Sequence, residues 1–216
     1  MSTLAGPVGT AVTNAENSVS NITSELVGMK GHTGLLVRHL YNNLAAIPNT
    51  TALFVQPYTG DGVCSALNGN SVTVVTVNDV TMYPTNMQAL AANVDLFKGS
   101  NTVTLHDADW ARMDLSGLPI INVVAYHGSN EAGRVNAALT RYLPVLANEF
   151  VVVINDWSIS QTRDWLNTFI TDNGITVEYS KDEGDLHEGV DPPVANPTGW
   201  WTGVHVAVLK KSRFQY

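Results

Sequence analysis

Residues 51–67 read Thr51-Ala-Leu-Phe-Val-Gln-Pro-Tyr-Thr-Gly-Asp-Gly-Val-Cys-Ser-Ala-Leu67. The apolar beginning predicts a buried strand, the segment Pro-Tyr-Thr-Gly predicts a turn, and the residues after Gly60 predict a helix. A strand, a glycine turn and a helix N-terminus bring backbone N–H groups to one point, where a cofactor can lie against bare backbone. The stretch therefore has the shape of a nucleotide-cofactor loop, but its strand lacks the carboxylate that such loops carry.

The rest of the chain alternates helical and strand-like patterns around this stretch. We expect helices over 33–46, 61–68, 84–97, 131–141 and 158–173, and strands over 52–56, 72–77, 102–106, 120–126, 150–154, 175–180 and 203–209. Repeated β-α units predict a parallel sheet covered by helices on both faces. The last two strands are joined by a loop, which predicts an antiparallel edge hairpin. The predicted fold is α/β and doubly wound (Rossmann-like), with seven mostly parallel strands.

Residues 1–30 are rich in Ser, Thr, Asn, Gly and Ala but carry a regular series of apolar residues. These are Val12, Ala15, Val19, Ile22 and Leu26. Spacings of three and four predict a single helical stripe, and hence an N-terminal helical arm preceding an α/β domain of residues 31–216. Two interpretations remain open, namely an arm packed on its own domain and an arm docked on a neighbouring subunit.

The composition narrows the possible partners. With 216 residues the chain is long enough for one domain with a substantial core. Charged residues make up 14% and the formal charge is −8, so no basic patch for nucleic acid is expected. No apolar run is long enough for a membrane span. We expect a cytoplasmic protein, or a virion protein if a virus encodes it.

Several residue types that often carry chemistry have a structural interpretation here. The single cysteine, Cys64, excludes an intramolecular disulfide framework and is interpreted as a small core residue. The six histidines show no paired close spacing, so no metal site is predicted. No G-x-S-x-G elbow occurs. The acidic loop 181–198 is interpreted as solvated in preference to a Ca²⁺ site.

Four further motifs carry a resemblance to a known family. They are Ser65-Ala-Leu-Asn-Gly-Asn70, Ala138-Leu-Thr-Arg-Tyr-Leu-Pro-Val-Leu146, Asn155-Asp-Trp157 and Gly199-Trp-Trp-Thr-Gly-Val-His-Val-Ala-Val-Leu-Lys-Lys211. Through them the chain resembles small class I S-adenosylmethionine-dependent methyltransferases of the kind carried by marine microbes and their viruses. The resemblance covers residues 30–211.

The resemblance implies a set of cofactor-binding positions, and several of them are altered. Where the family has a carboxylate and then a glycine at the end of the first strand, this chain has Phe54 and Gln56. Gly60 matches a glycine of the loop. The ribose-binding carboxylate is expected after the second strand, where Asp79 could serve if the loop shifts by one residue; the alternative is an Asx turn. Asp107 or Asp109 could accept hydrogen bonds from the adenine edge, although loop aspartates more often form turns.

The ends of the fourth and fifth strands, where such sheets place reactive groups, are altered as well. An aspartate-glycine-x-histidine element of the family reads His127-Gly128-Ser129-Asn130 here, and a paired aspartate reads Asn155-Asp156. If the protein is active, His127 is the candidate base and Asp156 the remaining acid. A single Asp156 beside Asn155 is a poor ligand set for Mg²⁺.

Altered pocket positions within a preserved frame lead to two main hypotheses. The first is a methyltransferase-fold protein that has lost catalysis, uses no cofactor, and serves in a larger assembly such as a virion, joined through residues 1–30 to protein partners or to copies of itself. The second is an active methyltransferase that uses S-adenosylmethionine on an unknown small-molecule acceptor. A binder of another small molecule is the third possibility.

Overall fold

The computed structural model describes residues 2–78, 86–127, 134–184 and 195–212. Its helices are α1 (Ala5–Glu16), α2 (Ser24–Val27), α3 (Leu35–Ala45), α4 (Asp61–Leu67), α5 (Asn86–Phe97), α6 (Arg134–Tyr142) and α7 (Ser160–Asp172), with a short 3-10 turn, Leu143–Val145. The strands are β1 (Thr51–Val55), β2 (Thr73–Asn78), β3 (Thr102–Asp107), β4 (Ile121–Tyr126), β5 (Leu146–Asn155), β6 (Thr176–Glu183) and β7 (Val204–Lys210).

The strands form one seven-stranded sheet with the order β3-β2-β1-β4-β5-β7-β6. The first five strands in this order are parallel, and β7 runs antiparallel to both β5 and β6. This confirms the predicted doubly wound α/β fold with its antiparallel edge hairpin. The strand order reverses direction between β1 and β4, so the carboxyl ends of these two strands border the crevice where such folds bind ligands.

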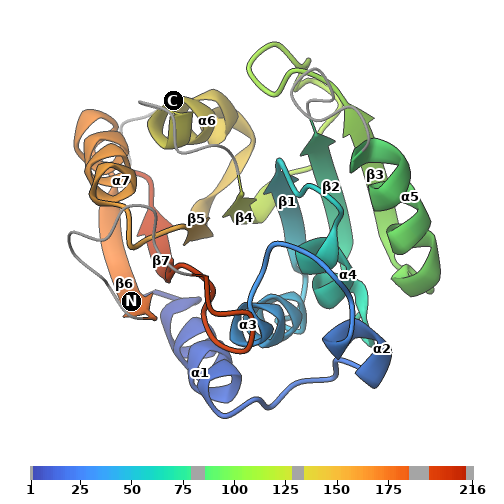
Figure 1. Cartoon of the computed structure of the whole chain (residues 1–216). Coiled ribbons are helices and arrows are strands. Elements are labelled where there is room, and N and C mark those ends of the chain that lie inside the picture. The colour runs from blue at the N-terminus through green and yellow to red at the C-terminus, as the bar shows by residue number, and fades with distance from the viewer. Residues whose placement is uncertain (1, 79–85, 128–133, 185–194, 213–216) are drawn as a thin grey trace.

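Helices cover both faces of the sheet, and each face has its own apolar core (Figure 1). One core joins alternate strand residues such as Phe54 and Val206 to α1, α3, α4 and α5. The other joins Leu53, Val55 and Leu209 to α6 and α7. Because successive strand residues point to opposite faces, a strand that is apolar throughout is suited to this arrangement.

The apolar stripe of the N-terminal arm predicts one continuous helix, but the arm in the structure is interrupted. Helix α1 ends at Glu16, and Ser18 adopts a left-handed backbone with φ of 55°. Val12 and Ala15 are buried against the domain, whereas Val19 is 55% exposed. The chain turns there because Ser20 and Asn21 bond to side chains of α3 instead of extending the helix. The apolar side of α1 is thus covered within the same chain.

Helix α7 begins two residues later than the predicted helix over 158–173, and its end lies within one residue of the prediction. Ser158 does not cap the helix, whose N-cap is Ile159 and which has no side-chain cap bond. The Ser158 N–H donates instead to the Thr202 carbonyl at 3.1 Å, which holds Ser158 outside the helix. At the C-terminus Gly174 takes a left-handed φ of 56°, as a helix-terminating glycine does.

The acidic segment predicted as a loop begins inside a strand. Strand β6 continues to Glu183, because Lys181 and Asp182 pair with Val206 and His205 of β7. The other acidic residues of this segment, Asp185, Glu188 and Asp191, lie outside the described residues. None of the helices in the described ranges is long and apolar enough to cross a membrane.

Cys64 lies fully buried in α4, which confirms its interpretation as a core residue. Burial, with a smaller contribution from the Asp61 carboxylate, raises the pKa of its thiol to about 12. The thiol is therefore protonated at neutral pH and is a poor nucleophile.

The packing of α1 gives a stability prediction. Val12→Asp should lower the free energy of unfolding by about 3 kcal/mol, because a carboxylate would be buried without a partner. Denaturant titration measures the change. The matched control is Val19→Asp at the exposed position, which should change stability by no more than about 0.5 kcal/mol. Equal effects of the two substitutions would contradict the packing of α1 described above.

Candidate functional site

The loop after β1 forms a tight turn with unusual backbone angles. Gln56, Tyr58 and Gly60 all have positive φ, at 56°, 51° and 88°. The Gly60 N–H donates to the Pro57 carbonyl at 2.9 Å, and a Cβ on Gly60 would overlap the Leu90 side chain. Gly60 thus lies at the N-terminus of α4, where the sequence places it. Gln56 holds a left-handed conformation that costs a side-chain-bearing residue energy and that glycine adopts freely.

The first residue of α4, Asp61, connects this loop to the segment before α3. Its buried carboxylate accepts hydrogen bonds from the Thr33 N–H at 2.9 Å and from the Thr33 hydroxyl. It also pairs with the Arg38 guanidinium at 3.4 Å. A Cβ on Gly31 would overlap the Asp61 carboxyl group, so the segment crosses directly against this side chain. Sequence reasoning assigned Asp61 no role.

Arg38 forms hydrogen bonds with the same part of the chain. Its Nη1 donates to the carbonyls of Leu26 at 2.8 Å and Met29 at 2.7 Å, and its Nε donates to the Thr33 hydroxyl at 3.3 Å. Together with Asp61 it fixes residues 26–33 across the start of α4. The positive end of α4 therefore faces a carboxylate of the chain itself, and the buried cation that neutralises this carboxylate makes four hydrogen bonds within the chain.

An aromatic cluster occupies the position of the expected carboxylate. Phe54 is buried, and its ring centroid lies 5.2 Å from that of Tyr41 and 6.0 Å from that of His127. The Tyr41 hydroxyl lies 2.8 Å from His127 Nε2 and accepts a hydrogen bond from Asn155 Nδ2 at 2.8 Å. The Tyr41 oxygen has two acceptor lone pairs, so it can bond Asn155 and His127 together, and the histidine tautomer sets the direction of the Tyr41–His127 bond.

The electrostatic environment of this cluster favours neutral groups. Burial lowers the pKa of His127 to about 4, against a smaller opposing effect of the Asp61 carboxylate. Burial also raises the pKa of Tyr41 far above its usual value, and the carboxylates of Asp61 and Asp156 add to this rise. The candidate base is thus uncharged at neutral pH, but its Nε2 is hydrogen-bonded to the Tyr41 hydroxyl and its side chain is buried.

The second candidate catalytic residue, Asp156, lies at the end of β5. It has a positive φ of 56°, and its carboxylate accepts a hydrogen bond from the Thr202 hydroxyl. The next residue, Trp157, donates its N–H to the Gly203 carbonyl at 3.2 Å. His127 is thus hydrogen-bonded to Tyr41, and Asp156 joins the end of β5 to the turn before β7. Their roles in catalysis stay predictions.

The remaining candidate cofactor residues occupy the ends of β2 and β3. Asp107 is exposed at the end of β3, paired in register with Asn78. Asp109 accepts a hydrogen bond from the Ala111 N–H at 2.9 Å and pairs with Arg112 at 3.3 Å, so it forms a turn. Asp79 lies outside the described residues. Adenine and ribose contacts of these three residues stay predictions.

One polar side chain at this edge was missed by sequence reasoning. Asn78, the last residue of β2, is fully buried, and in the described structure neither its amide oxygen nor its amide nitrogen has a hydrogen-bond partner. An unpaired buried polar group costs about 1–3 kcal/mol. The sequence offers a weak signal, because an asparagine that ends an apolar strand is usually assigned to a turn.

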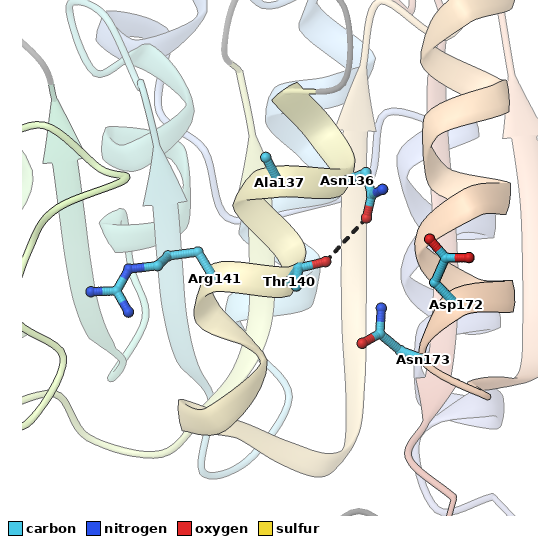
Figure 2. A pocket seen from close by; sticks show the side chains of 6 residues that line it. All are labelled: Asn136, Ala137, Thr140, Arg141, Asp172 and Asn173. Carbon is cyan, nitrogen blue, oxygen red and sulfur yellow. Dashed lines mark hydrogen bonds between the residues drawn. The ribbon is translucent and has the colours of Figure 1, made fainter.

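Two cavities lie away from these strand ends. A shallow hollow of about 500 Å³ lies between α6 and α7, where Asn136 and Thr140 face Asp172 and Asn173 (Figure 2). The other, of about 260 Å³, is lined by β2, β3 and residues 114–119, with His106 on its wall. Neither is lined by Gly60, His127 or Asp156. Within the described ranges no group of three or more His, Cys, Asp or Glu side chains could hold a metal ion.

The chain has the fold of class I S-adenosylmethionine-dependent methyltransferases. It is similar to precorrin-6y C5,15-methyltransferase from Geobacter metallireducens, with 18% identity, a TM-score of 0.54, and 81% of this chain and 87% of that chain covered. It is also similar to the O-methyltransferase TomG from Streptomyces achromogenes in complex with SAM, with 12% identity, a TM-score of 0.56, and coverage of 94% and 89%.

A third similar structure is TrmN from Thermus thermophilus, with 13% identity, a TM-score of 0.58, and coverage of 87% of this chain and 52% of that chain. No protein-family model and no curated protein matches the sequence. At these identities the likeness establishes the fold.

The buried ion pair gives a second stability prediction. Asp61→Asn should lower the free energy of unfolding by about 3–5 kcal/mol, because it leaves the Arg38 charge buried without a countercharge. The matched control is Asp95→Asn, which removes an exposed pair with Lys98 and should cost no more than about 1 kcal/mol. Chemical denaturation of both variants measures the difference, and a small effect of Asp61→Asn would contradict the buried pair.

The lowered pKa of His127 predicts a pH dependence of stability. In the unfolded chain the imidazole of His127 has a pKa near 6.5 and is protonated below that pH. In the folded chain its pKa is about 4, so between pH 6.5 and about 4 only the unfolded state binds the proton. The contribution of neutral His127 to the free energy of unfolding is therefore present above pH 6.5 and is lost as the pH falls toward 4. His127→Gln should reduce the slope of unfolding free energy against pH in this window by about 1 kcal/mol per pH unit.

A direct measurement of the same property is NMR of the His127 ring. Its carbon-bound protons should keep their chemical shifts between about pH 5.5 and 8, since the ring remains neutral there. A His127 titration midpoint within that range would show that the ring is not buried as described.

Proposed function

We propose that this is a methyltransferase-fold protein that has lost catalysis and serves as a structural or interaction component of a larger assembly, such as a virus particle. The observation that carries the proposal is the Phe54 cluster. A ring packed between Tyr41 and His127 stands where the fold's cofactor site needs a carboxylate.

The physical argument concerns the charged end of the cofactor. S-adenosylmethionine carries an ammonium and a carboxylate at its amino-acid end, and both need polar partners once they leave water. Phe54 supplies none. The buried cation of this region, Arg38, already neutralises Asp61 and donates to the carbonyls of Leu26 and Met29. Binding the cofactor would therefore leave charged groups poorly compensated.

A second candidate function is an active S-adenosylmethionine-dependent methyltransferase, and two observations favour it. The Gly60 turn keeps the shape of a cofactor loop, and the buried Asn78 amide lacks partners that a ribose hydroxyl could supply. In this interpretation Gly60, Asp79, Asp107 and Asp109 hold the cofactor, while His127 and Asp156 act on the acceptor. The similar structures, which include an O-methyltransferase in complex with SAM, support the class of chemistry.

Thermal unfolding with and without ligand distinguishes the two functions. We expect no shift in Tm with about 1 mM S-adenosylmethionine or S-adenosylhomocysteine, whereas a ligand at a hundredfold excess over its Kd adds about 2.7 kcal/mol. An O-methyltransferase of the same fold, measured under the same conditions, is the positive control. A saturable shift that Asn78→Val abolishes would overturn the loss of cofactor binding and support the active enzyme.

A further inference from the structure

The two edges of the sheet are protected to different degrees. The edge strands are β6 and β3, and an edge strand presents unpaired N–H and C=O groups that can pair with another chain. Natural proteins protect such edges with charges, bulges or covering segments. A difference between the two edges therefore indicates which of them is available for an interaction.

Strand β6 carries several protective features. It contains Glu178, Lys181, Asp182 and Glu183, so half of its eight residues are charged. Its pairing with β7 shifts register between Val177 and Tyr179, which marks a bulge. Lys181 also reaches Glu16 of α1 at 3.5 Å. These features oppose pairing with another strand.

Strand β3 lacks these features. Its sequence, Thr-Val-Thr-Leu-His-Asp, has no lysine and no proline, and its only acid is the last residue, Asp107. Its register with β2 is unbroken over all six residues, and Thr102 and Thr104 are exposed. β-branched residues with low charge in a regular edge strand are suited to pairing with a further strand.

The hydrogen-bonding pattern shows which backbone groups of β3 face away from β2. The Ala108 N–H donates to the Asn78 carbonyl of β2 at 3.3 Å. In a parallel pair alternate residues direct both backbone groups to the same neighbour, so Thr102, Thr104 and His106 face β2. Val103 and Leu105 therefore direct their N–H and C=O groups away from the sheet.

We propose that β3 pairs antiparallel with β3 of a second copy of this chain, which extends the sheet across a twofold axis. In the best register Val103 lies opposite Leu105 of the second copy, and each such pair exchanges both N–H···O bonds. Thr104 lies opposite Thr104 of the second copy, a favourable cross-strand pair. Asp107 falls beyond these pairs.

A second copy of this chain is the proposed partner because the β3 edge is complementary to itself. A twofold interface uses the same patch on both copies, and the register above places no like charges opposite each other although the chain carries a formal charge of −8. The pairing goes beyond the proposed function, because a sheet edge can pair whether or not the strand ends bind a cofactor.

Sedimentation of the full chain over about 5–200 µM tests the pairing. We expect a monomer–dimer equilibrium, with amide exchange at Val103 and Leu105 slowed as concentration rises. Thr104→Lys places two like charges opposite each other and should raise the dimer Kd at least about tenfold. The matched control, Thr176→Lys on the opposite edge strand, should change the Kd less than about twofold.

Thr104 is exposed, so its substitution should leave the fold intact, which circular dichroism checks. If this variant does not fold, sedimentation of the wild-type chain still tests the proposal. A chain that remains monomeric at about 200 µM would overturn the proposal. So would a dimer that persists in Thr104→Lys, or one in which Val103 and Leu105 exchange at the monomer's rate.

Discussion

The buried carboxylate of Asp61 is the constraint on which the arrangement around the first strand depends. A carboxylate removed from water must be paired and hydrogen-bonded, and here Thr33 and Arg38 meet that need. Because Arg38 belongs to α3 and Asp61 opens α4, the pair joins two helices to the glycine turn. The carbonyls of Leu26 and Met29 complete the Arg38 environment, so the approach to α3 is fixed as well.

The ends of the central strands carry a buried group of aromatic and polar side chains. Phe54, Tyr41 and His127 form a buried group in which neutral states are favoured, and Asn155 continues it through one hydrogen bond. Such a group stabilises the ends of the neighbouring parallel strands β1, β4 and β5 through packing and satisfied polar atoms. It does not offer the exposed, charged groups that hold a cofactor with an ammonium and a carboxylate.

Much of the fold could be predicted from the sequence, because apolar periodicity reports burial directly. The β-α alternation and the closing hairpin gave the correct sheet. The predictions that differed depended on tertiary contacts: Ser158 bonds to the turn at Thr202 and lies outside α7, and the arm bends where Asn21 bonds to α3. Residues distant in sequence decide both outcomes.

The candidate site was less predictable for the same reason. Gly60 was predicted from the sequence, because a turn that needs a positive φ favours glycine at that position. The Asp61–Arg38 pair links residues of two different helices, and no local pattern indicates it. The isolation of the Asn78 amide is likewise visible only in three dimensions.

The left-handed residues at the carboxyl edge have a consequence for how this site can change over time. Gln56, Tyr58, Asp156 and Trp201 bear side chains yet adopt backbone angles that glycine prefers. The surrounding packing therefore imposes the loop shapes, at a cost of about 1–2 kcal/mol per residue. Side chains at these positions can be exchanged one at a time without rebuilding the loops, so a single inherited frame can lose one binding chemistry and acquire another by separate small steps.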